Sequence, residues 1–198
     1  MGKVWRLADG KSGMNEQDLR VIKTEQCIEA AFLRVLCEKP YRAITVQDIL
    51  DTATINRSTF YRHYASKDAL AEKMVGNFRQ CYGQFLNERF NVANQENLIV
   101  CLDQFWAFIQ TQKQRILALW QIKTPHINLY DDMYLLIKQN FMEHAKRRNR
   151  PGNLEYQAHT YAILVLNTLS YCLQHEQYVS LDDIRNDLML MLQTARMQ

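Results

Sequence analysis

Hydrophobic residues recur every three or four positions along most of this chain, the spacing that gathers them on one face of an α-helix. The pattern predicts two short helices between residues 45 and 64, and longer helices over residues 15–38, 67–91, 95–111, 112–122, 130–146, 154–176 and 181–196. Only 3 proline and 6 glycine residues occur among the 198, so few positions break a helix. We therefore predict an all-α fold.

The two short helices carry capping signals separated by a turn. Thr45 and Asp48 have the spacing of a capping box, and Asn56 is a favoured N-cap residue for the second helix. Phe60 and Tyr64 repeat four residues apart and predict its buried face. The other face is cationic, hydroxyl-bearing and aromatic, with no acidic residue: Arg57, Ser58, Thr59, Tyr61, Arg62 and His63. Such a helix can enter the major groove of DNA and contact phosphates and base edges.

The long helix over residues 67–91 begins with a lysine at an unusual position. Ser66 is its predicted N-cap, and Lys67 follows at the first helical position, where a cation opposes the helix dipole. A DNA phosphate would satisfy the free helix amides and the ammonium together. The alternative is an ordinary exposed lysine.

This stretch resembles the DNA-binding domain of the TetR family of bacterial transcriptional regulators. The residues that fall on the family's motif are Thr45, Ile49, Ala53, Thr59, Phe60, Tyr61, His63, Ser66, Lys67, Asp68 and Leu70. Two positions depart, since Thr54 replaces the usual turn glycine and Pro40 stands where a glycine normally ends the first helix. Thr54 would be strained if that turn requires a positive φ. We expect DNA contacts from Thr45, Gln47, Asn56, Arg57, Ser58, Thr59, Tyr61, Arg62, His63 and Lys67.

The resemblance also implies how the chain is divided. We predict a mobile N-terminal arm over residues 1–14, a three-helix domain with the helix-turn-helix over 15–66, a connecting helix over 67–92 and a larger helical domain over 93–198. The basic arm could instead follow the minor groove, although a disordered terminus is preferred. Gly76 and Gly83 in the connecting helix are either packing sites or weak points.

The larger domain has aromatic residues suited to a small-molecule pocket, since such pockets are lined mainly by apolar and aromatic groups. The candidates are Phe105, Trp106, Trp120, His126, Tyr130, Tyr134 and Phe141. Few polar groups lie within reach of such a pocket, and Gln121 and Asn140 are among them. This favours a mostly apolar ligand with one or two hydrogen-bonding groups. The alternative for each aromatic residue is an ordinary place in the core.

The last two helices predict a dimerisation face. The helix over residues 154–176 is apolar nearly all round, so we expect it to be buried on two sides. The resemblance implies a four-helix bundle between two copies, with these contact residues: Tyr161, Val165, Leu166, Leu169, Cys172, Leu173, Ile184, Leu188 and Met191. Burial wholly within one chain is the alternative.

Charge and composition argue against a non-specific polyanion binder, a metalloprotein, an enzyme and a membrane protein. A net charge of +3 is too small for a non-specific polyanion binder, and the basic run over residues 146–150 is assigned to a solvated loop. The 5 cysteines lack metal-binding spacing and are expected to be reduced, and no H-E-x-x-H motif or glycine-rich phosphate loop occurs. We predict no enzyme activity, metal or cofactor. No signal peptide or membrane-spanning run is visible, which predicts a cytoplasmic protein associated with the bacterial nucleoid.

As the resemblance implies, we predict a homodimeric repressor. It would bind a palindromic operator in double-stranded DNA and leave it when a small apolar ligand fills the larger domain. In the alternative, the larger domain binds a protein partner instead of a ligand.

Overall fold

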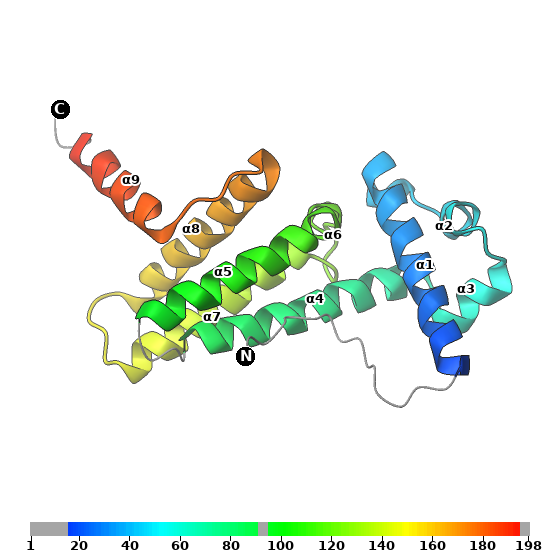
Figure 1. The fold of residues 1–198 in the computed structure, drawn as a ribbon, viewed down its shortest axis with the longest axis horizontal. Helices are drawn as coiled ribbons and strands as arrows, with labels where there is room; N and C mark the ends of the chain where they lie inside the picture. The colour runs from blue at the N-terminus through cyan, green and yellow to red at the C-terminus, as the bar shows by residue number, and fades with distance from the viewer. Residues whose placement is uncertain (1–15, 91–94, 195–198) are drawn as a thin grey trace.

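The computed structural model describes residues 16–90 and 95–194, and its regular elements over those ranges are helical (Figure 1). They are α1 (Glu16–Glu38), the 3-10 turn η1 (Tyr41–Ala43), α2 (Val46–Ala53), α3 (Arg57–His63), α4 (Lys67–Phe90), α5 (Gln95–Thr111), α6 (Lys113–Leu119), α7 (Leu129–Arg147), α8 (Leu154–His175) and α9 (Leu181–Thr194). The prediction of an all-α fold is confirmed. The arm expected over residues 1–14 lies outside the described residues.

The first three α-helices form a small N-terminal domain around one core (Figure 1). Phe32 of α1, Ile49 of α2 and Phe60 of α3 are all fully buried in this core. α1 ends two residues before Pro40, because proline disfavours helical conformation at the residue before it. The turn η1 then leads into α2.

α4 runs from the N-terminal domain into a larger C-terminal domain (Figure 1). Its 24 residues correspond to a length of about 36 Å. A methyl group added at Gly83 would lie 4.0 Å from Leu136 of α7, so Gly83 lies at a helix contact. At Gly76, no atom lies within 4 Å of such a methyl group. Gly76 is therefore the weak point rather than a packing site, since glycine lowers helix stability by roughly 1 kcal/mol relative to alanine.

In the C-terminal domain, α7 packs against both α4 and α8, and α5 lies along α4. The core between them is apolar, with Ile109, Ile137 and Leu173 fully buried. A loop runs back from the end of α8 to the start of α9, and α9 then diverges from α8, so that the two helices form a V (Figure 1). Leu190 and Met191 of α9 are exposed.

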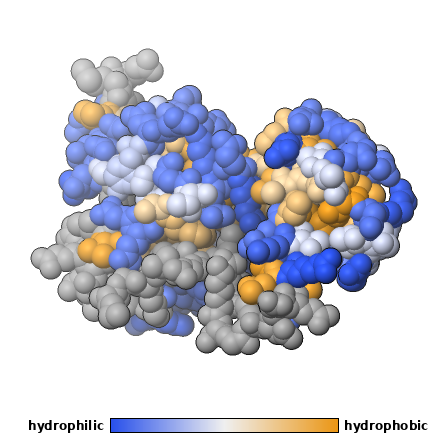
Figure 2. Space-filling view, turned by 45° about the vertical axis from the view of Figure 1, so that its right-hand side comes forward, coloured by the Kyte–Doolittle hydropathy of each residue, from blue (hydrophilic) through white to orange (hydrophobic). Residues whose placement is uncertain are grey.

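The two domains meet where α6 packs against α1. Figure 2 shows them as two lobes, with blue hydrophilic residues over much of the described surface in that view. Contact between the lobes therefore runs through α4 and through the α1 and α6 pair, which positions the small domain relative to the larger one.

Candidate nucleic-acid interface and ligand cavity

The start of α2 is fixed by the predicted capping box. The Thr45 hydroxyl accepts a hydrogen bond from the Asp48 amide at 3.2 Å, and the Thr45 amide donates to Asp48 Oδ2 at 2.7 Å. Lys39 Nζ lies 2.7 Å from the same carboxylate. Hydrogen bonds from Lys39 and Thr45 lower the pKa of Asp48 to about 2. The carboxylate is thus held in its charged form at the amino end of α2, where the helix dipole favours it.

The turn between α2 and α3 requires a positive φ at Thr54, so this residue has the strained conformation that was expected for that case. Thr54 has φ 54° and ψ 46°, in the left-handed region. The Ile55 amide donates to the Leu50 carbonyl at 3.2 Å, which closes the turn. A β-branched residue is disfavoured in this region, where glycine would be unstrained.

α3 is held at its amino end by Asn56, whose side-chain oxygen accepts from the Thr59 amide and the Ser58 hydroxyl, both at 2.8 Å. Phe60 and Tyr64 are buried as predicted. The outward face is exposed and consists of Arg57, Ser58, Tyr61 and Arg62, with Thr59 half-buried beside them. Two cations, a hydroxyl and an aromatic ring therefore face solvent from one short helix.

α2 contributes a neighbouring polar group to this surface. Gln47 accepts from Arg57 Nη2 at 3.4 Å and donates to Asp51 at 2.8 Å. Thr45 and Asn56 are exposed, but their side chains are engaged in capping. Their predicted role as DNA contacts would therefore compete with their role in starting the helices.

Two predicted contact residues face elsewhere. The His63 side chain is only 7% exposed and lies 3.5 Å from Glu25 of α1. Residue 63 follows Phe60 by three positions, which places it toward the buried face of α3. The Lys67 ammonium donates to the Tyr41 and Ile44 carbonyls at 2.9 and 2.8 Å and lies 4.3 Å from the centre of the Tyr41 ring. Neither an exposed lysine nor a phosphate contact describes this state, in which Lys67 ties α4 to η1.

A cavity of about 140 Å³ lies in the C-terminal domain and is lined by residues of α4, α5, α7, α8 and α9. Its walls include the aromatic rings of Tyr82, Phe85 and Phe105. Arg89 is the cation in this lining, and its guanidinium donates a hydrogen bond to the Tyr161 hydroxyl. Burial raises the pKa of Tyr161, with Arg89 opposing the shift, so the hydroxyl is neutral at physiological pH.

Comparison with known proteins identifies the small domain. Residues 28–74 match the family model described as bacterial regulatory proteins, tetR family. The N-terminal domain is a tetR-family DNA-binding domain. The chain is also similar to the uncharacterized HTH-type transcriptional regulator YxbF of Bacillus subtilis (strain 168), with 39% identity over 37% of this chain and 23% of the relative. The match thus spans less than a quarter of that relative's length.

The likeness in fold extends beyond the tetR-family domain. A solved structure of a gamma-butyrolactone receptor (ArpA-like protein) superposes with a TM-score of 0.56 at 14% identity, covering 91% of this chain and all of that one. Reduced E. coli NemR gives a TM-score of 0.48 at 14% identity, covering 85% and 96%. The predicted fold class, a helix-turn-helix domain followed by a larger helical domain, is confirmed.

The structure places only some of the residues predicted for the ligand pocket at the cavity. Phe105 and Trp106 line the cavity. The others lie elsewhere: Trp120 makes an edge contact with Tyr130, Tyr134 bonds His159, Phe141 packs on Tyr161, and His126 is exposed. Sequence reasoning missed Arg89, although its spacing from Tyr82, Phe85 and Leu86 places all four on one face of α4.

The predicted dimer residues are divided between the core and the surface. Leu166, Leu169, Cys172 and Leu173 are buried within the chain, because α8 packs on α7 through this face. Several of the others, Tyr161, Val165 and Ile184, line the cavity with Leu169 and Cys172. Leu188 and Met191 are exposed as a dimer contact requires.

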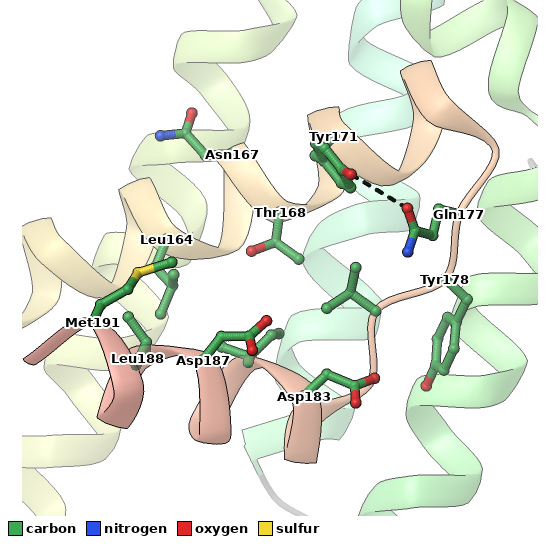
Figure 3. Close-up of a pocket in the computed structure, with 12 residues that line it drawn as sticks. Leu164, Asn167, Thr168, Tyr171, Gln177, Tyr178, Asp183, Asp187, Leu188 and Met191 are labelled. Atoms are coloured by element: carbon green, nitrogen blue, oxygen red, sulfur yellow. Dashed lines mark hydrogen bonds between the residues drawn. The ribbon is translucent and has the colours of Figure 1, made fainter. Parts of the chain in front are cut away.

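A groove of about 630 Å³ separates α8 from α9. Figure 3 shows Leu164 and Tyr171 of α8 and Leu188 and Met191 of α9 facing it from opposite sides. Nearby on α8, Ile163 is also exposed.

In the part of the chain that the structure describes, no group of three or more His, Cys, Asp or Glu could hold a metal ion. Over the same residues, no helix combines the length and hydrophobicity needed to span a bilayer.

Proposed function

We propose that this protein is a dimeric transcriptional regulator that binds an approximately palindromic operator through α3 and is released when a small molecule occupies the cavity beside Arg89. It would work as a repressor in the bacterial cytoplasm, at the nucleoid. The observation that carries the DNA-binding part is the exposed face of α3, with Arg57, Ser58, Tyr61 and Arg62 on a rigidly capped helix.

Local chemistry supports specific rather than general binding to DNA. Arg57 and Arg62 can form hydrogen bonds with base edges and phosphates, while Ser58 and Tyr61 add hydroxyl groups. With a net charge of only +3, the molecule has little long-range attraction for DNA. Affinity would therefore depend on contacts made by this one helix in each of two half-sites.

The V between α8 and α9 supports a dimer. Apolar side chains on both arms are exposed in one chain, including Ile163, Leu190 and Met191. A second copy related by a two-fold axis would place its own α8 and α9 against them, because such an interface uses the same surface on both chains. The two α3 helices would then address half-sites separated by about 34 Å or a multiple of that distance.

α4 supports a link between the cavity and DNA. Arg89 and Tyr82 contribute to the cavity from the carboxyl half of this helix, while Lys67 at its amino end is bonded to the small domain. A ligand that changes the position of α4 would change the spacing of the two α3 helices. The similar gamma-butyrolactone receptor indicates that this fold can serve a small-molecule receptor.

The alternative is that a protein partner, rather than a ligand, controls DNA binding. The cavity of about 140 Å³ favours it, because ordinary ligand pockets are roughly 300–1,000 Å³. A screen for small molecules that stabilise the protein and lower its affinity for DNA distinguishes the two.

The test of DNA binding uses duplexes enriched by in vitro selection from a randomised library. In mobility-shift titrations at fixed salt, Arg57→Ala and Tyr61→Ala should each weaken binding by about 1–3 kcal/mol, with unchanged thermal melting. Tyr156→Ala is the matched control, because Tyr156 is an exposed tyrosine on α8. Enrichment of no duplex, or equal affinity of all three variants and the wild type, contradicts the proposal.

A further inference from the structure

We propose that the cavity binds a small carboxylic acid, with an apolar body of benzene-like size and its carboxylate on Arg89. This inference rests on the proposed function, since it names the class of molecule that would fill the same cavity. It goes beyond the sequence-based expectation of an apolar ligand by assigning that ligand a negative charge and a place for it.

The walls define the body of the ligand. Tyr82 and Leu86 of α4, Phe105 of α5 and Ile137 of α7 are buried, and each has carbon atoms to offer as contact surface. The volume of about 140 Å³ is close to that of the engineered cavity of about 150 Å³ that binds benzene. A single ring or a short alkyl chain fits this space, whereas a long acyl chain does not.

Arg89 defines the head of the ligand. Its guanidinium contacts the Tyr161 hydroxyl and lies 5.5 Å from the centre of the Tyr161 ring. The hydroxyl is neutral, so this contact does not neutralise the positive charge of the guanidinium. A guanidinium has five N–H donors in a planar fork, and this fork matches a carboxylate with two parallel hydrogen bonds.

Two hydroxyl groups line the cavity together with this cation. Tyr161 and Thr168, both on α8, line the same cavity and can each donate a hydrogen bond to a carboxylate oxygen. A carboxylate on Arg89 therefore finds a charged fork and the neighbouring Tyr161 hydroxyl, while Thr168 offers a further donor elsewhere in the lining. A phosphate has more oxygens to satisfy and a larger hydration shell to lose, so the apolar walls disfavour it.

The carboxylate would also join two helices with different roles. Arg89 belongs to α4, which reaches the DNA-binding domain, and Tyr161 and Thr168 belong to α8, which carries the proposed dimer face. An anion between them would draw the end of α4 toward α8. Its binding energy would thus depend on the position of α4, as linkage to DNA binding requires.

The experiment compares benzoate with benzamide, a neutral molecule of nearly the same shape, by isothermal titration calorimetry on the full chain without DNA. We expect the wild type to bind benzoate at least tenfold more tightly than benzamide. Arg89→Met should abolish the preference, while Arg79→Met, a control at an exposed arginine on the same helix, should retain it. Equal binding of the two compounds, binding of neither, or a preference that survives Arg89→Met overturns the inference.

Further variants keep the test decisive if Arg89→Met fails to fold. If Arg89→Met does not melt cooperatively, Arg89→Lys keeps the charge without the fork and should bind benzoate with reduced affinity but still prefer it to benzamide. Tyr161→Phe should keep the preference, because the charge remains. An Arg89→Lys or Tyr161→Phe protein that folds and prefers benzamide overturns the inference.

A parallel titration of selected duplex DNA separates this inference from the proposed function. Preferential binding of benzoate with unchanged duplex affinity supports the ligand class and contradicts ligand-controlled release. Preferential binding of benzamide, with lowered duplex affinity, supports ligand-controlled release and overturns the carboxylic acid.

Discussion

Arg115 of α6 lies 2.6 Å from Glu29 of α1, and this ion pair joins the C-terminal domain to the DNA-binding domain. Both side chains are largely buried, with exposed fractions of 18% and 15%. The Tyr64 ring is buried near the same pair, where burial first and the charge of Glu29 second raise the pKa of its hydroxyl. The α1 and α6 helices and the end of α3 therefore meet at one charged contact.

Arg115→Met should lower the free energy of unfolding by about 1–3 kcal/mol, because it leaves a largely buried carboxylate without its partner. Chemical denaturation measures this change. The matched control is Arg185→Met, which breaks an exposed pair with Asp182 on α9 and should change stability by less than about 1 kcal/mol. Equal effects of the two substitutions would contradict the role assigned to the contact between α1 and α6.

Lys67→Met should destabilise the small domain as well as weaken DNA binding. It removes the two hydrogen bonds to the Tyr41 and Ile44 carbonyls, and charged hydrogen bonds of this kind contribute roughly 1.5–3 kcal/mol each. Thermal melting should therefore shift downward by several degrees. Lys73→Met, at a half-exposed lysine on the same helix, is the control and should shift melting less. An unchanged melting temperature for Lys67→Met, with weaker DNA binding alone, would restore the phosphate contact.

Thr54→Gly should stabilise the protein or leave its stability unchanged. The left-handed conformation costs a side-chain-bearing residue about 1–2 kcal/mol, and the extra chain entropy of glycine offsets roughly 0.5–1 kcal/mol of that. Thr52→Gly, two residues earlier and inside α2, should instead destabilise, since it also removes a hydrogen bond to the Asp48 carbonyl. Urea denaturation of both variants measures the contrast, and a loss of stability in Thr54→Gly contradicts it.

Ile163→Glu and Met191→Glu should convert a dimer into a folded monomer, because both residues are exposed on the V formed by α8 and α9. Sedimentation velocity at micromolar concentration measures the change. Leu135→Glu is the control, as it alters a comparably exposed apolar residue on another helix, α7. Leu166→Glu should unfold the chain rather than dissociate it, since Leu166 is buried. A wild type that sediments as a monomer would contradict the dimer.

The sequence was most informative where the causes of structure are local. Helix ends depend on residues within a few positions, so the capping roles of Thr45 and Asn56 and the end of α1 before Pro40 could all be predicted. Burial depends on partners far along the chain. Lys67 binds carbonyls 26 and 23 residues away, and no local pattern indicates such a contact.

The C-terminal site was predicted less well for a related reason. The sequence of a helix that is apolar all round, such as α8, indicates that both of its faces are buried. It does not indicate which face packs against its own chain and which against a second copy. Leu166 and Leu173 were therefore predicted to contact a second copy, whereas they are buried within their own chain. Among the aromatic residues, Trp120 and Phe105 are both large and apolar enough to line a pocket, and only the packing of the helices decides which of them borders the cavity.

Gly76 changes how motion can pass along α4. Packing does not require a glycine there, yet it lies between the end of α4 bonded to the DNA-binding domain and the end that borders the cavity. A glycine softens a helix against bending, since it adds backbone freedom and contributes no side-chain contacts. The two halves of α4 are therefore coupled through a compliant joint. The movement that a ligand imposes at Arg89 would therefore reach α3 attenuated, and the attenuation would be greater the lower the bending stiffness of the turn around Gly76.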